Sequence, residues 1–144
     1  AGELVEVIGA RCPSLGAARG RGIDGICLGG AEAILTGFSY PEVFGMVGGM
    51  QIAMEYQMSL IAAVDEINEG EAPIPYLHIM TSDRDAYRDR IRAWSDRLAS
   101  RNARYEFQEY RGRHDMEFYE EVGGPMLIRR FLHWFHDGRE EPLW

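Results

Sequence analysis

The sequence predicts an α/β protein, a three-layer sandwich in which a mostly parallel sheet lies between helices. Two observations predict this class. Short apolar runs typical of buried strands alternate along the chain with longer runs of helical periodicity. Turn residues and then polar side chains follow several of the apolar runs, as at the carboxyl ends of parallel strands. A chain of 144 residues, 46% of them hydrophobic, fits one domain over residues 1–144.

The first part of the chain predicts a helix, a loop, a strand and a second helix. Residues 2–10 have apolar side chains on one side of a short helix, and residues 11–22 are rich in Gly, Pro and Arg, as loops are. Residues 23–27 are apolar apart from one Asp and indicate a short buried strand that ends in a turn. Residues 31–38 contain good helix formers, and this helix should stop before Pro41, because the residue before a proline resists the α region.

The middle of the chain predicts two more strands with a helical insertion between them. Residues 44–50 form a second apolar run, and residues 51–68 predict a mostly helical insertion with a methionine-rich face. A break at residues 70–75 precedes a third strand at residues 75–80. Residues 83–100 then predict a long Arg-rich amphipathic helix, because their apolar residues recur at helical spacing.

The last part of the chain predicts a fourth strand and two helices. Residues 104–110 alternate between apolar and polar side chains, as a strand does, and residues 111–115 should form a tight loop. Residues 116–122 indicate a short helix, and residues 125–137 a final amphipathic one. Strands and helices thus alternate throughout, and ligands of such sheets bind at the carboxyl ends of the strands.

The composition excludes several classes of partner. The formal net charge is −8 and there is no lysine, which disfavours nucleic acid and an anionic membrane surface and excludes a lysine mechanism. No apolar run approaches the length that spans a bilayer, and the first residues do not resemble a signal peptide. We therefore expect a soluble, cytoplasmic protein that binds a small molecule and contacts neither nucleic acid nor membrane.

Two cysteines, Cys12 and Cys27, are too few for a disulfide scaffold, and we expect two free thiols in a reducing compartment. The four histidines and two cysteines show no metal-ligand spacing, so no metal site is predicted. Nothing in the sequence indicates a cofactor.

One ordered set of residues points to nucleophilic catalysis. Gly25-Ile26-Cys27-Leu28-Gly29 has the shape of the G-x-S-x-G nucleophile elbow, with Cys27 in place of serine. Asp83, Asp85 and His114 come later, near the ends of predicted strands. A nucleophile, an acid and a base in this order form the triad of α/β hydrolases, and the backbone N–H of Leu28 would donate to an oxyanion.

The same motifs carry a resemblance to a family. The chain, from about residue 3 to residue 135, resembles the C-terminal half of the esterase D and enterochelin esterase group of α/β hydrolases. Pro41 to Phe44 fits that group's P-x-x-F, and Gly112 to Tyr119 fits its G-G-H-[DS]-x-x-x-[WY]. The resemblance implies an esterase-like α/β-hydrolase fold with a triad of Cys27, His114 and either Asp85 or Asp83.

The chain departs from this group at several positions. The cysteine nucleophile is similar to that of dienelactone hydrolases, whose elbow reads G-x-C-x-G-G. Arg113 replaces the second glycine of G-G-H, and the acid loop Ser82-Asp83-Arg84-Asp85 lacks the group's glycine, so the sequence does not choose between the two aspartates. Members of the group also carry a comparable stretch before the elbow. We therefore expect a second chain that supplies this N-terminal half, or a homodimer.

Two functions follow from these observations. In the first, the chain is an enzyme that attacks an ester, thioester, lactone or other electrophilic small molecule through Cys27. Acyl transfer or bond formation in secondary metabolism would then be an alternative to hydrolysis. Met50, Met54 and Arg113 are the expected substrate-binding residues. In the second, the chain is a degraded hydrolase half that binds a ligand or stabilises a partner.

Overall fold

The computed structural model describes residues 2–11, 17–68, 75–100 and 103–137. Its helices are α1 (Gly2–Arg11), α2 (Leu28–Ser39), α3 (Gln57–Asn68), α4 (Arg88–Ala99), α5 (Met116–Phe118) and α6 (Gly124–Asp137). Its strands are β1 (Gly22–Ile23), β2 (Met46–Met50), β3 (Tyr76–Arg84) and β4 (Tyr105–Arg113). Short 3-10 turns lie at Ala18–Gly20 and Met54–Tyr56, and a π-helical segment at Tyr119–Gly123 joins α5 to α6.

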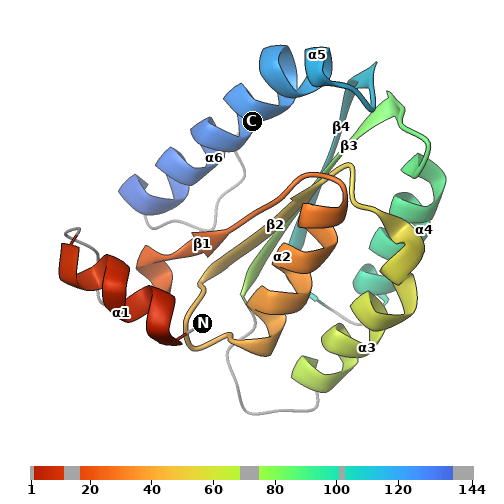
Figure 1. The fold of residues 1–144 in the computed structure, drawn as a ribbon. Helices are drawn as coiled ribbons and strands as arrows, with labels where there is room; N and C mark the ends of the chain where they lie inside the picture. Colours follow the sequence, from red (N-terminus) through yellow and green to blue (C-terminus); the bar gives the residue numbers. More distant parts are fainter. Residues whose placement is uncertain (1, 12–16, 69–74, 101–102, 138–144) are drawn as a thin grey trace.

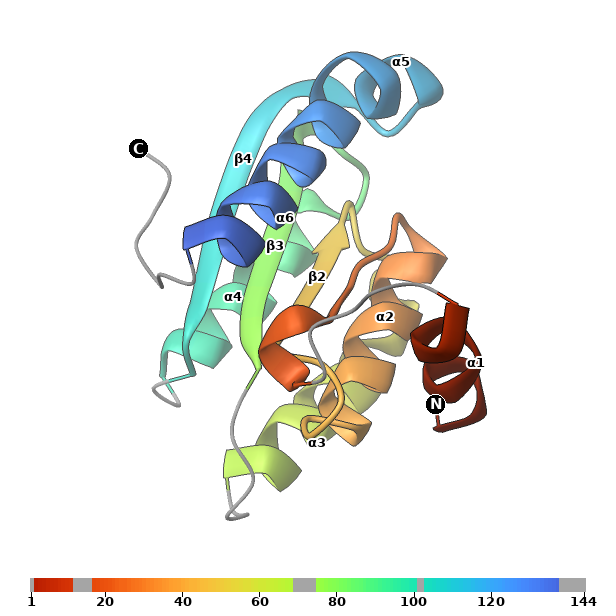
Figure 2. The same ribbon diagram turned by 90° about the vertical axis from the view of Figure 1, so that its left-hand side faces the viewer.

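The strands form one parallel sheet in the order β1-β2-β3-β4, so each strand pairs with the next one along the chain. Figures 1 and 2 show α6 on one face of this sheet and α2, α3 and α4 on the other. The α/β class and the layered arrangement predicted from the sequence are therefore confirmed. Since all four strands run the same way, their carboxyl ends meet at one edge.

The larger core fills the space between the sheet and α2, α3 and α4. Its buried members include Ile34 of α2, Ile79 of β3 and Trp94 of α4. α4 is amphipathic as predicted, because Ile91, Trp94 and Leu98 point inward at helical spacing. A smaller cluster of Met50, Met80 and Phe118 lies on the other face, packed against residues of β4, the π-helical segment and α6. Apolar burial on both faces explains the near-continuous apolar strands.

Several boundaries differ from those expected. The first strand is shorter: its ladder covers Gly22–Ile23, and beyond it Ile26 makes a single bridge to Met50. The third and fourth strands are longer and end at Arg84, where a helix was expected, and at Arg113, where a loop was expected. The reason is that β3 and β4 pair along almost their whole length, so backbone hydrogen bonding extends the strands through polar sequence.

The helices also differ at their starts. α4 begins at Arg88 because Thr81, Ser82 and Asp83 belong to β3. The insertion after β2 becomes helical only from Met54, since residues 51–53 turn beneath the elbow. α2 ends at Ser39, before Pro41, as expected. Of the expected loop at 11–22, residues 12–16 with Cys12 lie outside the described residues, and its last part holds the 3-10 turn at Ala18–Gly20. Of the expected break at 70–75, residues 70–74 lie outside the described residues.

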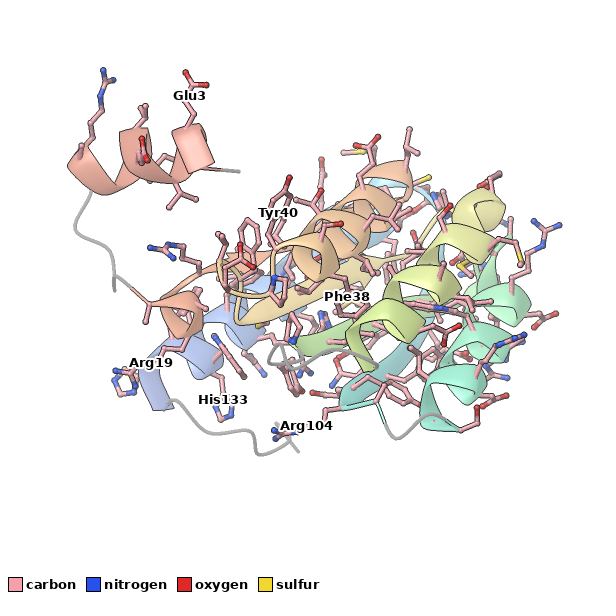
Figure 3. All side chains as sticks on the ribbon, turned by 90° about the horizontal axis from the view of Figure 1, so that it is seen from below. Glu3, Arg19, Phe38, Tyr40, Arg104 and His133 are labelled. Atoms are coloured by element: carbon pink, nitrogen blue, oxygen red, sulfur yellow. The ribbon has the colours of Figure 1, made fainter. Side chains whose placement is uncertain are left out.

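The N-terminal helix α1 covers the predicted residues and stands apart from the layers. Figure 3 shows it separated from the rest of the ribbon, with Glu3 pointing away. Val7 and Ile8 are about half exposed on it. An amphipathic helix normally buries such side chains, so this surface is unusually apolar.

Candidate active site

Four residues directly follow the four strands and so lie at the carboxyl edge of the sheet. Cys27 follows the bridge that extends β1, Gln51 follows β2, Asp85 follows β3 and His114 follows β4. Three of them were predicted as site residues. The edge where ligands of parallel sheets bind is thus the edge where a thiol, a carboxylate and an imidazole come together.

Cys27 occupies a strained turn between β1 and α2. Its φ is 57° and its ψ is −118°, a conformation that residues other than glycine rarely adopt. Its N–H donates to Met50 O at 2.9 Å, and α2 begins at the next residue. The sulfur belongs to a free, half-buried thiol. This is the backbone geometry that presents a side chain at the top of a strand-to-helix turn.

Two of the three glycines around Cys27 are needed for this tight turn. A Cβ on Gly25 would lie 2.1 Å from Gly29 O, and one on Gly30 would lie 2.9 Å from Gly25 O. A Cβ on Gly29 would meet nothing within 4 Å. The close approach of two backbones therefore requires glycine at Gly25 and Gly30, while Gly29 offers open space for a side chain.

His114 pairs with Asp85 and not with Asp83. Its Nδ1 lies 2.9 Å from Asp85 Oδ1, and the Asp85 side chain is fully buried. Asp85 also accepts hydrogen bonds from Thr81 Oγ1 at 2.7 Å and from the N–H of Tyr87 at 3.0 Å. With Nδ1–H donating to the carboxylate, Nε2 of the neutral ring is left as the acceptor.

Asp83 has a different place. It lies inside β3, at an irregularity of the β3–β4 register, and its Oδ1 accepts the N–H of Gly112 at 3.0 Å. Its side chain is exposed and lies 3.8 Å from the guanidinium of Arg84. Asp83 thus ties the end of β3 to the end of β4. The sequence could not choose between the aspartates, because it did not show that β3 continues to Arg84.

Two tyrosines pack against the imidazole of His114. The rings of Tyr87 and Tyr119 each meet the His114 ring edge-on, with centroids 5.9 Å apart. Burial raises the pKa of Tyr119 to about 12, with further contributions from the charges of Cys27 and Asp85. The pKa of Tyr87 is raised first by its hydrogen bond to Glu55, and the charge of Cys27 adds to this shift. The two rings that pack against His114 therefore belong to tyrosines whose pKa the charge of Cys27 helps to raise.

Leu28 is the first residue of α2, so its backbone N–H has no acceptor within the helix. Its side chain is exposed, as is that of Ile26, so the thiol of Cys27 is flanked by two apolar surface residues. The free N–H at a helix N-terminus is a favourable donor to negative charge.

The three expected substrate-binding residues are in different environments. Met50 and Met54 are 0% and 2% exposed and belong to the core, so their contacts are with the protein interior. Arg113 is exposed and lines a cavity of about 340 Å³ at the ends of β3 and β4. Other residues that line it are Arg84, Arg111, Asp115, Glu117 and Glu121. The prediction that Met50 and Met54 bind substrate was wrong because the spacing of methionines along a helix does not distinguish the lining of a pocket from the filling of a core.

One further residue, Gln51, was not predicted. It has a φ of 46° and a fully buried side chain whose amide spans the ends of β3 and β4. No local pattern marks a lone glutamine after a glycine-rich strand. Its contacts with β3 and β4 can be recognised only once the ends of the strands are placed side by side.

Within the described residues, no group of three or more His, Cys, Asp or Glu side chains gathers in a way that could hold a metal ion. None of the helices in that same part of the chain has the length and apolarity needed to cross a membrane.

Solved structures define the fold more closely. No protein-family model and no curated protein matches the sequence. The S-formylglutathione hydrolase of Staphylococcus aureus aligns over 93% of this chain and 58% of its own, with a TM-score of 0.78 and 18% identity. A fluorophosphonate-binding serine hydrolase of the same organism aligns over 94% of this chain and 62% of its own, with a TM-score of 0.74 and 17% identity.

A third similar structure is the enterobactin esterase of Shigella flexneri, with a TM-score of 0.74 and 18% identity. It aligns over 94% of this chain and 38% of its own. The chain therefore shares the fold of these proteins and spans less than two thirds of their length. One of them is a serine hydrolase by name, whereas the elbow of this chain carries a cysteine.

Proposed function

We propose that the chain is the catalytic part of an esterase-like enzyme of the α/β-hydrolase fold, with Cys27 as nucleophile, His114 as base and Asp85 as the acid that orients it. One observation carries the proposal. An elbow cysteine with positive φ and a His114–Asp85 hydrogen bond of 2.9 Å lie at the same edge of one parallel sheet. Nucleophile, base and orienting acid are the three parts that such catalysis needs.

In the first half of the proposed reaction, His114 Nε2 accepts the proton of the Cys27 thiol. The sulfur attacks the carbonyl carbon of the substrate, and the carbonyl electron pair moves to oxygen. The Leu28 N–H donates to this oxyanion. When the oxyanion collapses, the bond to the leaving alcohol, thiol or enol breaks. His114 returns the proton to the leaving group, and an acyl-cysteine remains.

In the second half, His114 takes a proton from an incoming nucleophile, which attacks the carbonyl carbon of the acyl-cysteine. The bond between this carbon and the Cys27 sulfur then breaks, and His114 returns the proton to the sulfur. Water gives hydrolysis, and an alcohol, amine or carbon nucleophile gives acyl transfer or bond formation. A thioester is more reactive toward such acceptors than an oxygen ester. The replacement of serine by Cys27 therefore supports acyl transfer, for example in secondary metabolism, beside hydrolysis. The substrate class is a small or medium ester, thioester, lactone or related electrophile.

Arg113 is proposed to bind the substrate. Its exposed guanidinium lines the cavity next to the His114 loop, together with Arg84 and Arg111. Guanidinium groups bind carboxylate and other anionic oxygens well, so a polar part of the substrate would fit there. No cofactor and no metal enters this mechanism.

The reaction can be tested through the thiol. Mild alkylation of Cys27 by iodoacetamide at pH 7, followed by mass spectrometry, should run at least tenfold faster than alkylation of free cysteine, and His114→Ala should remove this advantage. Cys27→Ala should abolish turnover of activated esters and thioesters while the fold is retained. His133→Ala is a matched control on α6, outside the proposed triad.

The alternative function gives the opposite result. A Cys27 thiol that reacts no faster than free cysteine, and equally fast in His114→Ala, would overturn the catalytic proposal. It would support a degraded hydrolase half that binds a ligand or stabilises a partner. Full ester turnover by Cys27→Ala would also contradict the proposed nucleophile.

We also propose that the fold is completed by a second chain that supplies the N-terminal half, or by a second copy of this chain. The outer edge of β1 pairs with no other strand of the described sheet. α1 and α6 expose apolar side chains, among them Ile8, Ile128 and Leu132. Open sheet edges and apolar surfaces of this kind are normally covered.

The mass of the native protein from its own host, measured intact and after denaturation, tests the partner. A companion chain of comparable length, or a dimer, is the expected result. A lone 16.3 kDa species in the native measurement would contradict the partner proposal.

A further inference from the structure

The short segment from Met50 to Ala53 holds the backbone of Cys27 from both sides. Met50 O accepts the N–H of Cys27 at 2.9 Å, and the N–H of Ala53 donates to Cys27 O at 3.0 Å. Between these two contacts lies Gln51. A displacement of Gln51 would therefore also displace the turn that contains Cys27.

The side chain of Gln51 reaches in the opposite direction, toward His114 and Asp85. Its Nε2 donates to Arg113 O at 2.9 Å and to Ser82 Oγ at 2.6 Å. Arg113 directly precedes His114, and Ser82 O accepts the N–H of Asp85 at 3.2 Å. The amide group of Gln51 thus fixes two neighbouring positions. One is Arg113, beside His114, and the other is Ser82, near Asp85.

The backbone of Gln51 has a conformation that is unfavourable for a residue with a side chain. Its φ of 46° lies in the left-handed region, which costs a residue with a Cβ about 1 kcal/mol and which Gly or Asn adopts more easily. Its N–H donates to Met80 O at 2.7 Å, and its side chain is completely buried. A long amide in a strained and buried position is explained by the two hydrogen bonds that only a side chain of this length can make.

We propose that Gln51 is a positioning residue that sets the placement of His114 and Asp85 relative to Cys27. The inference rests on the proposed function and deepens it. Gln51 touches no reacting atom. It acts through Arg113 O and Ser82 Oγ, and it couples the ends of β2, β3 and β4 into one unit. Small displacements of a catalytic group cost large factors in rate, so the loss of this coupling should weaken the reaction without unfolding the chain.

The test variant is Gln51→Asn in the protein as its host produces it. Asn accepts the left-handed backbone as well as Gln does, but its amide is one methylene shorter and cannot make both hydrogen bonds. Gln108→Asn is the matched control, because Gln108 donates to Glu106 on β4, away from the four strand ends. Gln51→Glu is a second variant, with the same length and no donor when ionised.

Two readouts separate positioning from general stability. The first is the NMR signal of the His114 Nδ1–H proton, which a hydrogen bond to Asp85 shifts downfield and protects. We expect it to broaden or disappear in Gln51→Asn and to persist in Gln108→Asn. The second is the rate of Cys27 alkylation at pH 7, which should fall about tenfold in Gln51→Asn with an unchanged rate in the control.

Each outcome decides the inference. An unchanged Nδ1–H signal in Gln51→Asn overturns it, whatever the thiol does. A lost signal together with a slower thiol supports it. If His114→Ala leaves alkylation unchanged, the proposed function fails while the Nδ1–H signal still decides the role of Gln51. If Gln51→Asn does not fold, the same measurements on Gln51→Glu decide.

Discussion

Among the described residues, the pairs His114–Asp85 and His78–Asp24 can be compared, and the comparison shows what distinguishes a candidate site from a structural contact. His114 and Asp85 lie 2.9 Å apart after β4 and β3, with 23% of the His114 side chain exposed. His78 and Asp24 lie 3.4 Å apart in the middle of the sheet, with 0% and 4% of their side chains exposed. Both pairs combine an imidazole with a carboxylate, yet only the first has a partly exposed imidazole and lies at the same edge of the sheet as Cys27.

The surroundings of the second pair explain its structural nature. His78 lies in β3, and a Cβ on the neighbouring Gly48 would meet both Asp24 Oδ2 and His78 Nδ1. His78 Nε2 and Asp24 Oδ1 have no hydrogen-bond partner in the part of the chain that the structure describes. A buried pair with incomplete hydrogen bonding adds little to stability as a pair, although either member alone is costly. A short distance between a histidine and an aspartate is therefore not enough to indicate a catalytic site. The solvent exposure of the pair and the residues around it must also be considered.

The largest expected effect separates the pairs through stability. His78→Ala leaves the Asp24 carboxylate buried without its partner and should lower the free energy of unfolding by about 3–5 kcal/mol. His114→Ala removes a partly exposed ring and should cost about 1 kcal/mol, since Asp85 keeps two other hydrogen bonds. Urea unfolding followed by circular dichroism measures both values.

The double variant His78→Leu with Asp24→Leu keeps this comparison testable if His78→Ala does not fold. Replacing both members of a buried pair by apolar side chains should recover most of the lost stability. Equal losses for His78→Ala and His114→Ala would contradict the assignment of the buried pair to structure and the exposed one to chemistry.

A smaller effect, on the reaction rate, should separate Asp85 from Asp24. Asp85→Asn keeps the shape but no longer favours the Nδ1–H tautomer of His114, so turnover or Cys27 alkylation should fall about 100-fold. Asp24→Asn should leave the rate per folded molecule unchanged. The comparison is made with the same activated ester or alkylating agent for both variants.

The smallest effect is expected at Asp83. The amide oxygen of Asp83→Asn can still accept the N–H of Gly112, so rate and stability should change less than about twofold and about 0.5 kcal/mol. A drop as large as that of Asp85→Asn would mean that the register at the β3–β4 bulge controls the His114 loop.

The fold could be predicted from the sequence because its signals are local. Apolar runs, the Tyr40-Pro41 stop and the spacing of Ile91, Trp94 and Leu98 each act within one element. The extents of β3 and β4 could not be predicted, since polar residues such as Ser82 and Arg113 join strands only when a partner strand is present. The pairing between β3 and β4 therefore determines where these strands end, which their local sequence does not show.

The site shows the same division. Cys27 and His114 stand in recognisable motifs, and the structure brings both to one edge. The pairing of His114 with Asp85 could be seen only in the structure, because it depends on a hydrogen bond between two loops that are far apart in the sequence. The burial of Met50 and Met54 and the bridging amide of Gln51 are likewise properties of the packed sheet.

The order β1-β2-β3-β4 has a consequence for how the protein is made on the ribosome. Every strand finds its neighbour among the residues that are synthesised next, so the sheet can grow in step with translation from Gly22 onward. The turn at Cys27 gains its supports once Met50 and Ala53 have emerged, whereas its imidazole arrives last, with His114. The residues that support the backbone of Cys27 are therefore synthesised well before the imidazole of His114.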